Sequence, residues 1–176
     1  THIDAINIPE VHDEVGRGER PVSNQERGEP RKFGMLLQDI VGIEAIVNRV
    51  VVHMPLKKQM EWIQETYSKY EIDNLIIVGG ESSKQKYPGP TVNESLEKIS
   101  QDNRRRENSI LCGGICIPSR RKESKNLIRK SECGAEFFTT QVLCDSGNVI
   151  KMIKNYQERC DKVNTFPRRI LLSFTP

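Results

Sequence analysis

Six short apolar runs constrain the fold of this chain more than any other feature of its sequence. They are rich in β-branched or aromatic residues and do not alternate with polar ones, which is typical of strands buried on both faces of a parallel sheet. The runs lie at residues 5–8, 50–53, 75–78, 110–112, 137–140 and 170–172. Successive runs start roughly 25 to 45 residues apart, which leaves room for a crossover helix each time.

The stretches between the runs have the period of amphipathic helices. Residues 56–70 carry Met60, Ile63, Tyr67 and Tyr70 three or four apart, and residues 146–161 show the same one-sided pattern. Weaker patterns predict helices at 32–40, 91–101 and 122–132. The alternation predicts an α/β fold, either a (β/α)8 TIM-type barrel with about six βα units present or an open doubly wound sheet. For the barrel we expect residues 1–176 to form a single domain that is incomplete at both ends, two strands short of eight.

Composition narrows the class of protein. The 176 residues are 36% hydrophobic and 29% charged, as in one soluble globular domain. The net charge of +3 is too small for a nucleic-acid binder. No apolar run approaches the ~20 residues of a membrane span, and the start lacks a signal peptide, so we expect a cytoplasmic protein. The five cysteines are odd in number and irregularly spaced, which favours reduced, buried thiols over a disulfide scaffold or a metal site.

Several common catalytic and nucleotide-binding motifs are absent from the chain. The fingerprint GxGxxG and the phosphate loop GxxxxGK[ST] do not occur, which disfavours a Rossmann nucleotide site. The GxSxG elbow of serine hydrolases is also missing. A cysteine nucleophile would need a histidine partner that the sequence alone cannot place.

Polar side chains lie in, close or follow four of the predicted strands, toward their ends. They are Asn7, His53, Glu81 and Gln141. Because the carboxyl ends of parallel strands meet at one edge, where parallel α/β folds carry their chemistry, we expect these side chains to face a shared ligand. Each of them alone also fits a polar core residue that finds a hydrogen-bond partner.

Two further segments admit both a structural and a functional interpretation. Gly79 and Gly80 allow close backbone approach to a ligand, and they equally fit a plain tight turn. The basic run at 120–125 fits a solvated helix surface, and it also fits cations placed near a diphosphate at a strand–helix junction. The run at 104–106 is expected to be solvated surface.

The segment NLIRKSECGAEFFTTQ at residues 126–141 resembles the stretch of methylenetetrahydrofolate reductases that reads roughly NLxxKxxAGAxxxxTQ. Weaker similarity covers nearly the whole chain. Residues 73–81 resemble the family strand that ends in Arg-Gly-Asp, and residues 169–176 resemble a later strand with its closing proline.

The resemblance implies a flavin-bearing (β/α) barrel of one-carbon metabolism and methionine biosynthesis. Such an enzyme moves a hydride from NADH or NADPH through FAD, or FMN, to methylenetetrahydrofolate. By position, Glu81 and Gln141 would face the folate-type substrate. The residues that would hold the flavin are Asn7, His53, Glu123, Asn126, Arg129 and Lys130. The physical roles suit their chemistry, since Arg129 and Lys130 would offset diphosphate charge.

Departures from the family pattern motivate an alternative. The Arg-Gly-Asp motif has become Gly79-Gly80-Glu81, Tyr87 is only a candidate for the family's flavin-stacking tyrosine, and the strand with the general acid would precede Thr1. No catalytic residue is therefore assigned. The alternative is a non-catalytic or flavin-free folate-binding barrel subunit that acts with a methyltransferase partner. The sequence leaves open whether the chain forms a homo-oligomer or joins a partner subunit. A weaker third possibility is an unrelated barrel enzyme for a phosphorylated small molecule that uses the loop at 79–90.

Overall fold

Six parallel strands form one sheet in the computed structural model, which describes residues 3–10, 28–80, 85–106, 110–143 and 145–174. The strands are hydrogen-bonded in chain order, from β1 to β6. They are β1 (Ala5–Ile8), β2 (Glu44–Val50), β3 (Asn74–Val78), β4 (Leu111–Cys116), β5 (Phe137–Val142) and β6 (Arg169–Ser173). The helices between them are α1 (Pro30–Leu36), α2 (Leu56–Tyr70), α3 (Val92–Arg106), α4 (Glu123–Glu132) and α5 (Ser146–Lys162).

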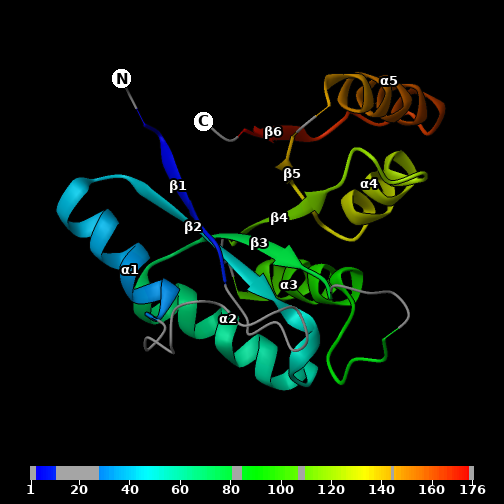
Figure 1. The fold of residues 1–176 in the computed structure, drawn as a ribbon. Coiled ribbons are helices and arrows are strands. Elements are labelled where there is room, and N and C mark those ends of the chain that lie inside the picture. The colour runs from blue at the N-terminus through cyan, green and yellow to red at the C-terminus, as the bar shows by residue number, and fades with distance from the viewer. Residues whose placement is uncertain (1–2, 11–27, 81–84, 107–109, 144, 175–176) are drawn as a thin grey trace.

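Strands that pair in chain order curve into an arc, and the helices follow one another around its outer side (Figure 1). Each helix returns the chain to the start of the next parallel strand, as a βαβ crossover requires. The result is α/β architecture with six strands in a half-barrel of the TIM type, which confirms the fold class that the sequence predicts.

The register fixes which side of each strand faces the helices. A Cβ on Gly34 of α1 would lie 3.0 Å from Ala45 Cβ and 3.3 Å from Ile8 Cδ1, so these two side chains face the helical layer. Their strand neighbours Asn7 and Ile46, which pair with each other, therefore face the concave side.

The same alternation holds in β4 and β5. A Cβ on Gly114 would lie 3.4 Å from Lys130 Cδ on α4, whereas a Cβ on Gly113 would lie 2.5 Å from the Phe137 ring. Gly114 therefore faces the helices, and Gly113 with Phe137 faces the concave side. The missing side chain at Gly113 gives the Phe137 ring its space.

The core lies between sheet and helices. Leu75, Ile77 and Phe138 are fully buried there, and Phe138 packs edge-on against Tyr156 of α5, with ring centroids 6.2 Å apart. Cys112, Cys116, Cys133 and Cys160 are free thiols buried in this layer. Burial raises the pKa of Cys116 to about 12 and that of Cys133 to about 11, so both thiols stay protonated.

Some predicted boundaries are wrong. The second strand is β2 at Glu44–Val50, and the run predicted as a strand at 50–53 is instead mostly the short 3-10 turn Val51–His53. The apolar residues Val51 and Val52 are buried in that turn, which explains the misleading pattern. The first helix starts at Pro30 and passes into a π-helical turn, Leu37–Val41. The helix predicted at 56–70 is confirmed.

Among the described residues, no helix combines the length and the apolar character that crossing a membrane requires. In the same part of the chain, no three His, Cys, Asp or Glu side chains gather in a way that could hold a metal ion.

The core packing predicts a large difference between two phenylalanine truncations. Phe138→Ala removes a ring that is 0% exposed and should lower the free energy of unfolding by about 3–5 kcal/mol. Phe166→Ala is the matched control, because Phe166 is 91% exposed, and it should change the free energy by less than about 0.5 kcal/mol. Urea unfolding followed by far-UV circular dichroism measures both. Equal effects would mean that Phe138 is not in the core.

Candidate functional site

Polar side chains gather toward the carboxyl ends of the strands. Asn7 is the third residue of the four in β1, His53 follows β2 by three residues, and Gln141 is the fifth of six residues in β5. All three are exposed. Because the strands are parallel, these side chains lie toward the same edge of the sheet. Glu81 lies outside the described residues.

Asn48 of β2 adds an unusual feature to the concave side. It lies two residues after Ile46, which faces that side, and it pairs with Ile76 of β3. Its Oδ1 is buried and accepts no hydrogen bond from the described residues. A buried acceptor without a partner costs about 1–3 kcal/mol, and Asn103 Oδ1 of α3 is a second such atom among the described residues.

Hydroxyl groups line the neighbouring ends of β5 and β6. Thr139 Oγ1 and Ser173 Oγ are 3.3 Å apart, and the Ser173 amide donates to Thr140 Oγ1 at 2.8 Å. The register shifts here, since Thr139 pairs with Leu171 but Val142 pairs with Ser173. This β-bulge puts one extra residue on β5, and Gln141 and Val142 are both exposed beside it.

The loops after β2 and β3 are locked together at this edge. The Gly89 amide donates to the Val52 carbonyl at 2.8 Å, and a Cβ on Gly89 would meet backbone atoms of residues 51, 52 and 54 at 2.4–2.6 Å. Tyr87 packs edge-on against His53, with ring centroids 5.7 Å apart, and covers Gly80. His53 and Tyr87 thus form an aromatic pair in the loops after β2 and β3, at the carboxyl edge of the sheet, which we call the mouth of the arc.

Glu123, at the start of α4, is the centre of a buried polar network. Its carboxylate accepts hydrogen bonds from the Ile117 amide at 3.0 Å, from Arg120 at 3.2 Å and from Asn126 at 3.1 Å. Lys130 Nζ lies 3.7 Å from the carboxylate and donates to the Ile115 carbonyl. The network ties the loop after β4 to α4.

Three of the six residues predicted to hold a flavin therefore bond to one another or to the backbone. The Glu123 side chain is 0% exposed and that of Lys130 is 12% exposed. Burial lowers the pKa of Lys130, and the Glu123 charge offsets part of that effect. Arg129, by contrast, is exposed, as are Arg120, Arg121 and Lys122 in the preceding loop. The predicted flavin role of these residues stays a prediction.

Sequence reasoning missed Asn48, Thr139 and Ser173. Asn48 is not singled out because the sequence predicts the second strand at 50–53, whereas β2 starts six residues earlier, at Glu44. Thr139 and Ser173 belong to apolar strands, and only the pairing of β5 with β6 brings their hydroxyls together.

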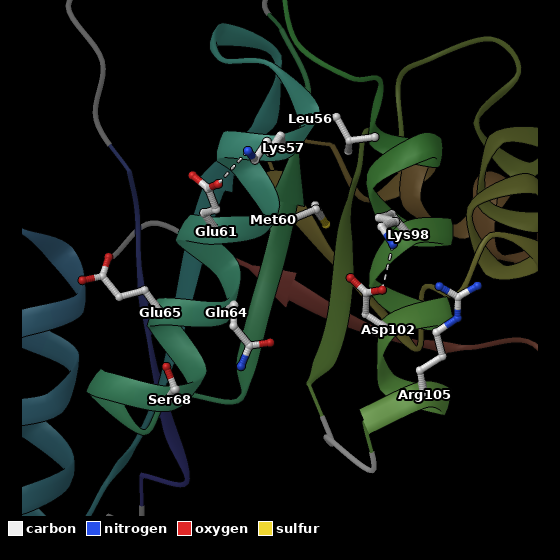
Figure 2. A pocket seen from close by; sticks show the side chains of 10 residues that line it. All are labelled: Leu56, Lys57, Met60, Glu61, Gln64, Glu65, Ser68, Lys98, Asp102 and Arg105. Carbon is white, nitrogen blue, oxygen red and sulfur yellow. Dashed lines mark hydrogen bonds and ion pairs between the residues drawn. The ribbon is translucent and has the colours of Figure 1, made fainter.

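A separate groove lies on the outer surface between α2 and α3 (Figure 2). It encloses about 830 Å³ and has Leu56 and Met60 on one wall and Lys98 with Asp102 on the other. Its charges are largely paired, since Lys57 lies 4.0 Å from Glu61 and Lys98 lies 2.8 Å from Asp102. None of the predicted site residues lines it.

The fold has counterparts among solved structures, although no protein-family model and no curated protein matches the chain. An uncharacterized protein from Clostridium thermocellum, described as binding two copies of 5-methyl-5,6,7,8-tetrahydrofolic acid, is similar with a TM-score of 0.62 and 18% identity. The match covers 78% of this chain and 47% of that one.

A 2,3-dimethylmalate lyase of the PEP mutase/isocitrate lyase superfamily is similar with a TM-score of 0.55 and 11% identity. Here the match covers 80% of this chain and 57% of that one. The chain thus spans about half the length of both structures. Both are TIM-barrel proteins, and at these identities the likeness establishes the TIM-barrel fold of the arc.

The locked loops predict that Gly89→Ala is destabilising. A Cβ there would press on three backbone atoms that cannot turn aside, and we expect a loss of about 1–3 kcal/mol in the free energy of unfolding. Gly28→Ala is the control, because nothing lies within 4 Å of its Cβ position. Thermal unfolding of both variants checks this, and an unchanged Gly89→Ala midpoint would contradict the locked arrangement.

The Glu123 network predicts that Glu123→Gln destabilises the fold far more than an exposed Glu→Gln change on the same helix. Glu123→Gln leaves the buried Lys130 ammonium without its counter-charge and should cost about 3–5 kcal/mol of stability. Lys130→Met in the same background should recover part of that loss. Glu132→Gln, an exposed change on the same helix, is the control. Urea titrations compare the four proteins; a Glu123→Gln variant as stable as the control would rule out the network as a stabilising unit.

Proposed function

We propose that the chain binds a reduced C1-folate at the carboxyl ends of its strands. The single observation that carries the proposal is the set of exposed polar side chains, Asn7, His53 and Gln141, at the carboxyl edge of the strands. A pterin ring offers N–H donors to an amide oxygen such as that of Asn7, and an amide such as Gln141 can both donate and accept along a pterin edge. The fold similarity to a protein described as binding 5-methyltetrahydrofolate supports the choice of ligand.

The aromatic pair supports a planar ligand. His53 and Tyr87 present an edge-on ring pair at the mouth of the arc, where a flat heterocycle can pack against an aromatic surface. The resemblance of residues 126–141 to methylenetetrahydrofolate reductases points to the same class of ligand.

Flavin-dependent reduction of the bound folate by NADH or NADPH is a second, finer candidate. The exposed Asn7, His53 and Arg129 are available to a flavin. Glu123 and Lys130 are not, because their charged groups are buried in mutual contacts that a flavin would have to replace. This arrangement favours the flavin-free binding subunit, for which a methyltransferase is the proposed partner.

Calorimetric titration of the full chain with 5-methyltetrahydrofolate tests the proposal. We expect binding, and we expect Gln141→Ala and Asn7→Ala each to weaken it about 5- to 100-fold through lost hydrogen bonds. Gln101→Ala, an exposed change on α3, should leave the affinity unchanged. No detectable binding to the unsubstituted chain would refute folate binding.

The same preparation separates the two candidates. Uptake of added FAD or FMN gives absorbance near ~450 nm, and oxidation of NADH or NADPH in its presence would favour the reductase. Folate binding by a protein that takes up neither flavin would favour the binding subunit.

A further inference from the structure

Two buried arginines meet on one indole between the sheet and α2. The Arg31 guanidinium lies 4.4 Å from the centre of the Trp62 ring, and the Arg49 guanidinium lies 4.3 Å from it. Arg31 comes from the start of α1 and Arg49 from the end of β2, and both residues are about 95% buried, at 6% and 5% exposure. Two like charges share one aromatic ring.

Each arginine also forms an ion pair with a carboxylate, Arg31 with Glu29 and Arg49 with Glu10. Glu29 accepts hydrogen bonds from Arg31 Nε at 3.0 Å and from Arg31 Nη2 at 2.9 Å. Glu10 accepts one from Arg49 Nη1, and its second oxygen accepts the Val50 amide at 2.6 Å. Glu65 adds a 3.1 Å contact to Arg31, and Gln59 accepts from Arg49 Nε at 2.8 Å.

The two main carboxylates stand on either side of the β1–α1 connection. Glu10 follows β1, and Glu29 is the N-cap of α1. Each is joined to an arginine, and both arginines are joined to the same ring. The connection leaves from the carboxyl end of β1, the edge at which (β/α) barrels carry their binding loops.

The electrostatics favour a cooperative unit. Burial lowers the pKa of Arg49, the Glu10 charge opposes that effect, and the nearby Arg31 charge adds to it. Removing Glu10 takes away the carboxylate that Arg49 hydrogen-bonds. Removing Glu29 leaves Arg31 with Glu65 as its only carboxylate partner among the described residues. Either change leaves a less compensated buried cation beside another cation, so the loss at one end of the connection is felt at the other.

We propose that Glu10, Arg49, Trp62, Arg31 and Glu29 act as one clamp that fixes the two ends of the β1–α1 connection relative to each other. The clamp is a positioning device at the carboxyl edge of the strands, and it does not rest on the proposed folate binding. Arg31 and Arg49 meet on Trp62 of α2, on the helical side of the sheet, so the members are positioning residues.

A double-mutant cycle between Glu10→Gln and Glu29→Gln tests the clamp. The two carboxylates share no hydrogen bond, and two independent ion pairs would give additive effects within about twofold in the unfolding equilibrium constant. A single clamp should give a deviation from additivity of at least about threefold. Repeating the cycle with Trp62→Leu should reduce the deviation, because both guanidinium groups pack on this indole and only their direct charge repulsion would remain. Additive effects, or a deviation of unchanged size without the indole, would overturn the proposal.

Native-state fluorescence gives a readout that needs no unfolding. Trp62 is the only tryptophan of the chain, so its emission reports on the clamp alone. Glu10→Gln and Glu29→Gln should each shift the emission maximum or its quenching by acrylamide. Glu61→Gln is the control, because this exposed residue precedes Trp62 on α2 and pairs with the exposed Lys57. A shift with Glu61→Gln alone, or with none of the variants, would count against the clamp.

Discussion

Main-chain pairing of six parallel strands in chain order is the constraint on which the rest of this structure depends. It fixes one side of every strand toward the helices and the other toward the concave side, and it brings all the carboxyl ends to one edge. Asn7, Asn48 and Thr139 can share a surface only because β1, β2 and β5 run in the same direction. The strand topology therefore determines which side chains can lie together at the candidate site.

The sequence predicts the order of the elements and most of the helices, because apolar periodicity is a local signal. It misplaces the second strand, because EAIVNRV at Glu44–Val50 contains Glu, Asn and Arg, which a buried strand would not be expected to carry. Arg49 can be buried because it packs on the Trp62 ring and donates hydrogen bonds to Gln59 and Glu10. These partners lie 10 to 39 positions away in the chain, so no local sequence pattern predicts them.

The same limit applies to the candidate site. His53 and Gln141 could be singled out because each follows an apolar run and is exposed at the expected edge. Glu123 and Lys130 could be singled out by resemblance, but their burial against each other depends on how α4 packs on β4. Sequence reasoning therefore identifies candidate residues better than it identifies which of them a ligand can reach.

The extra residue in β5 has a consequence for how that strand end can vary. Ordinary pleating would expose one of any two adjacent side chains and cover the other, yet Gln141 and Val142 are both open to solvent. A chain that lost one residue between Thr139 and Val142 would regain regular pairing with β6 but would present a single side chain where two now stand. This strand end should therefore tolerate the replacement of Gln141 or Val142 far better than the deletion of a residue between Thr139 and Val142.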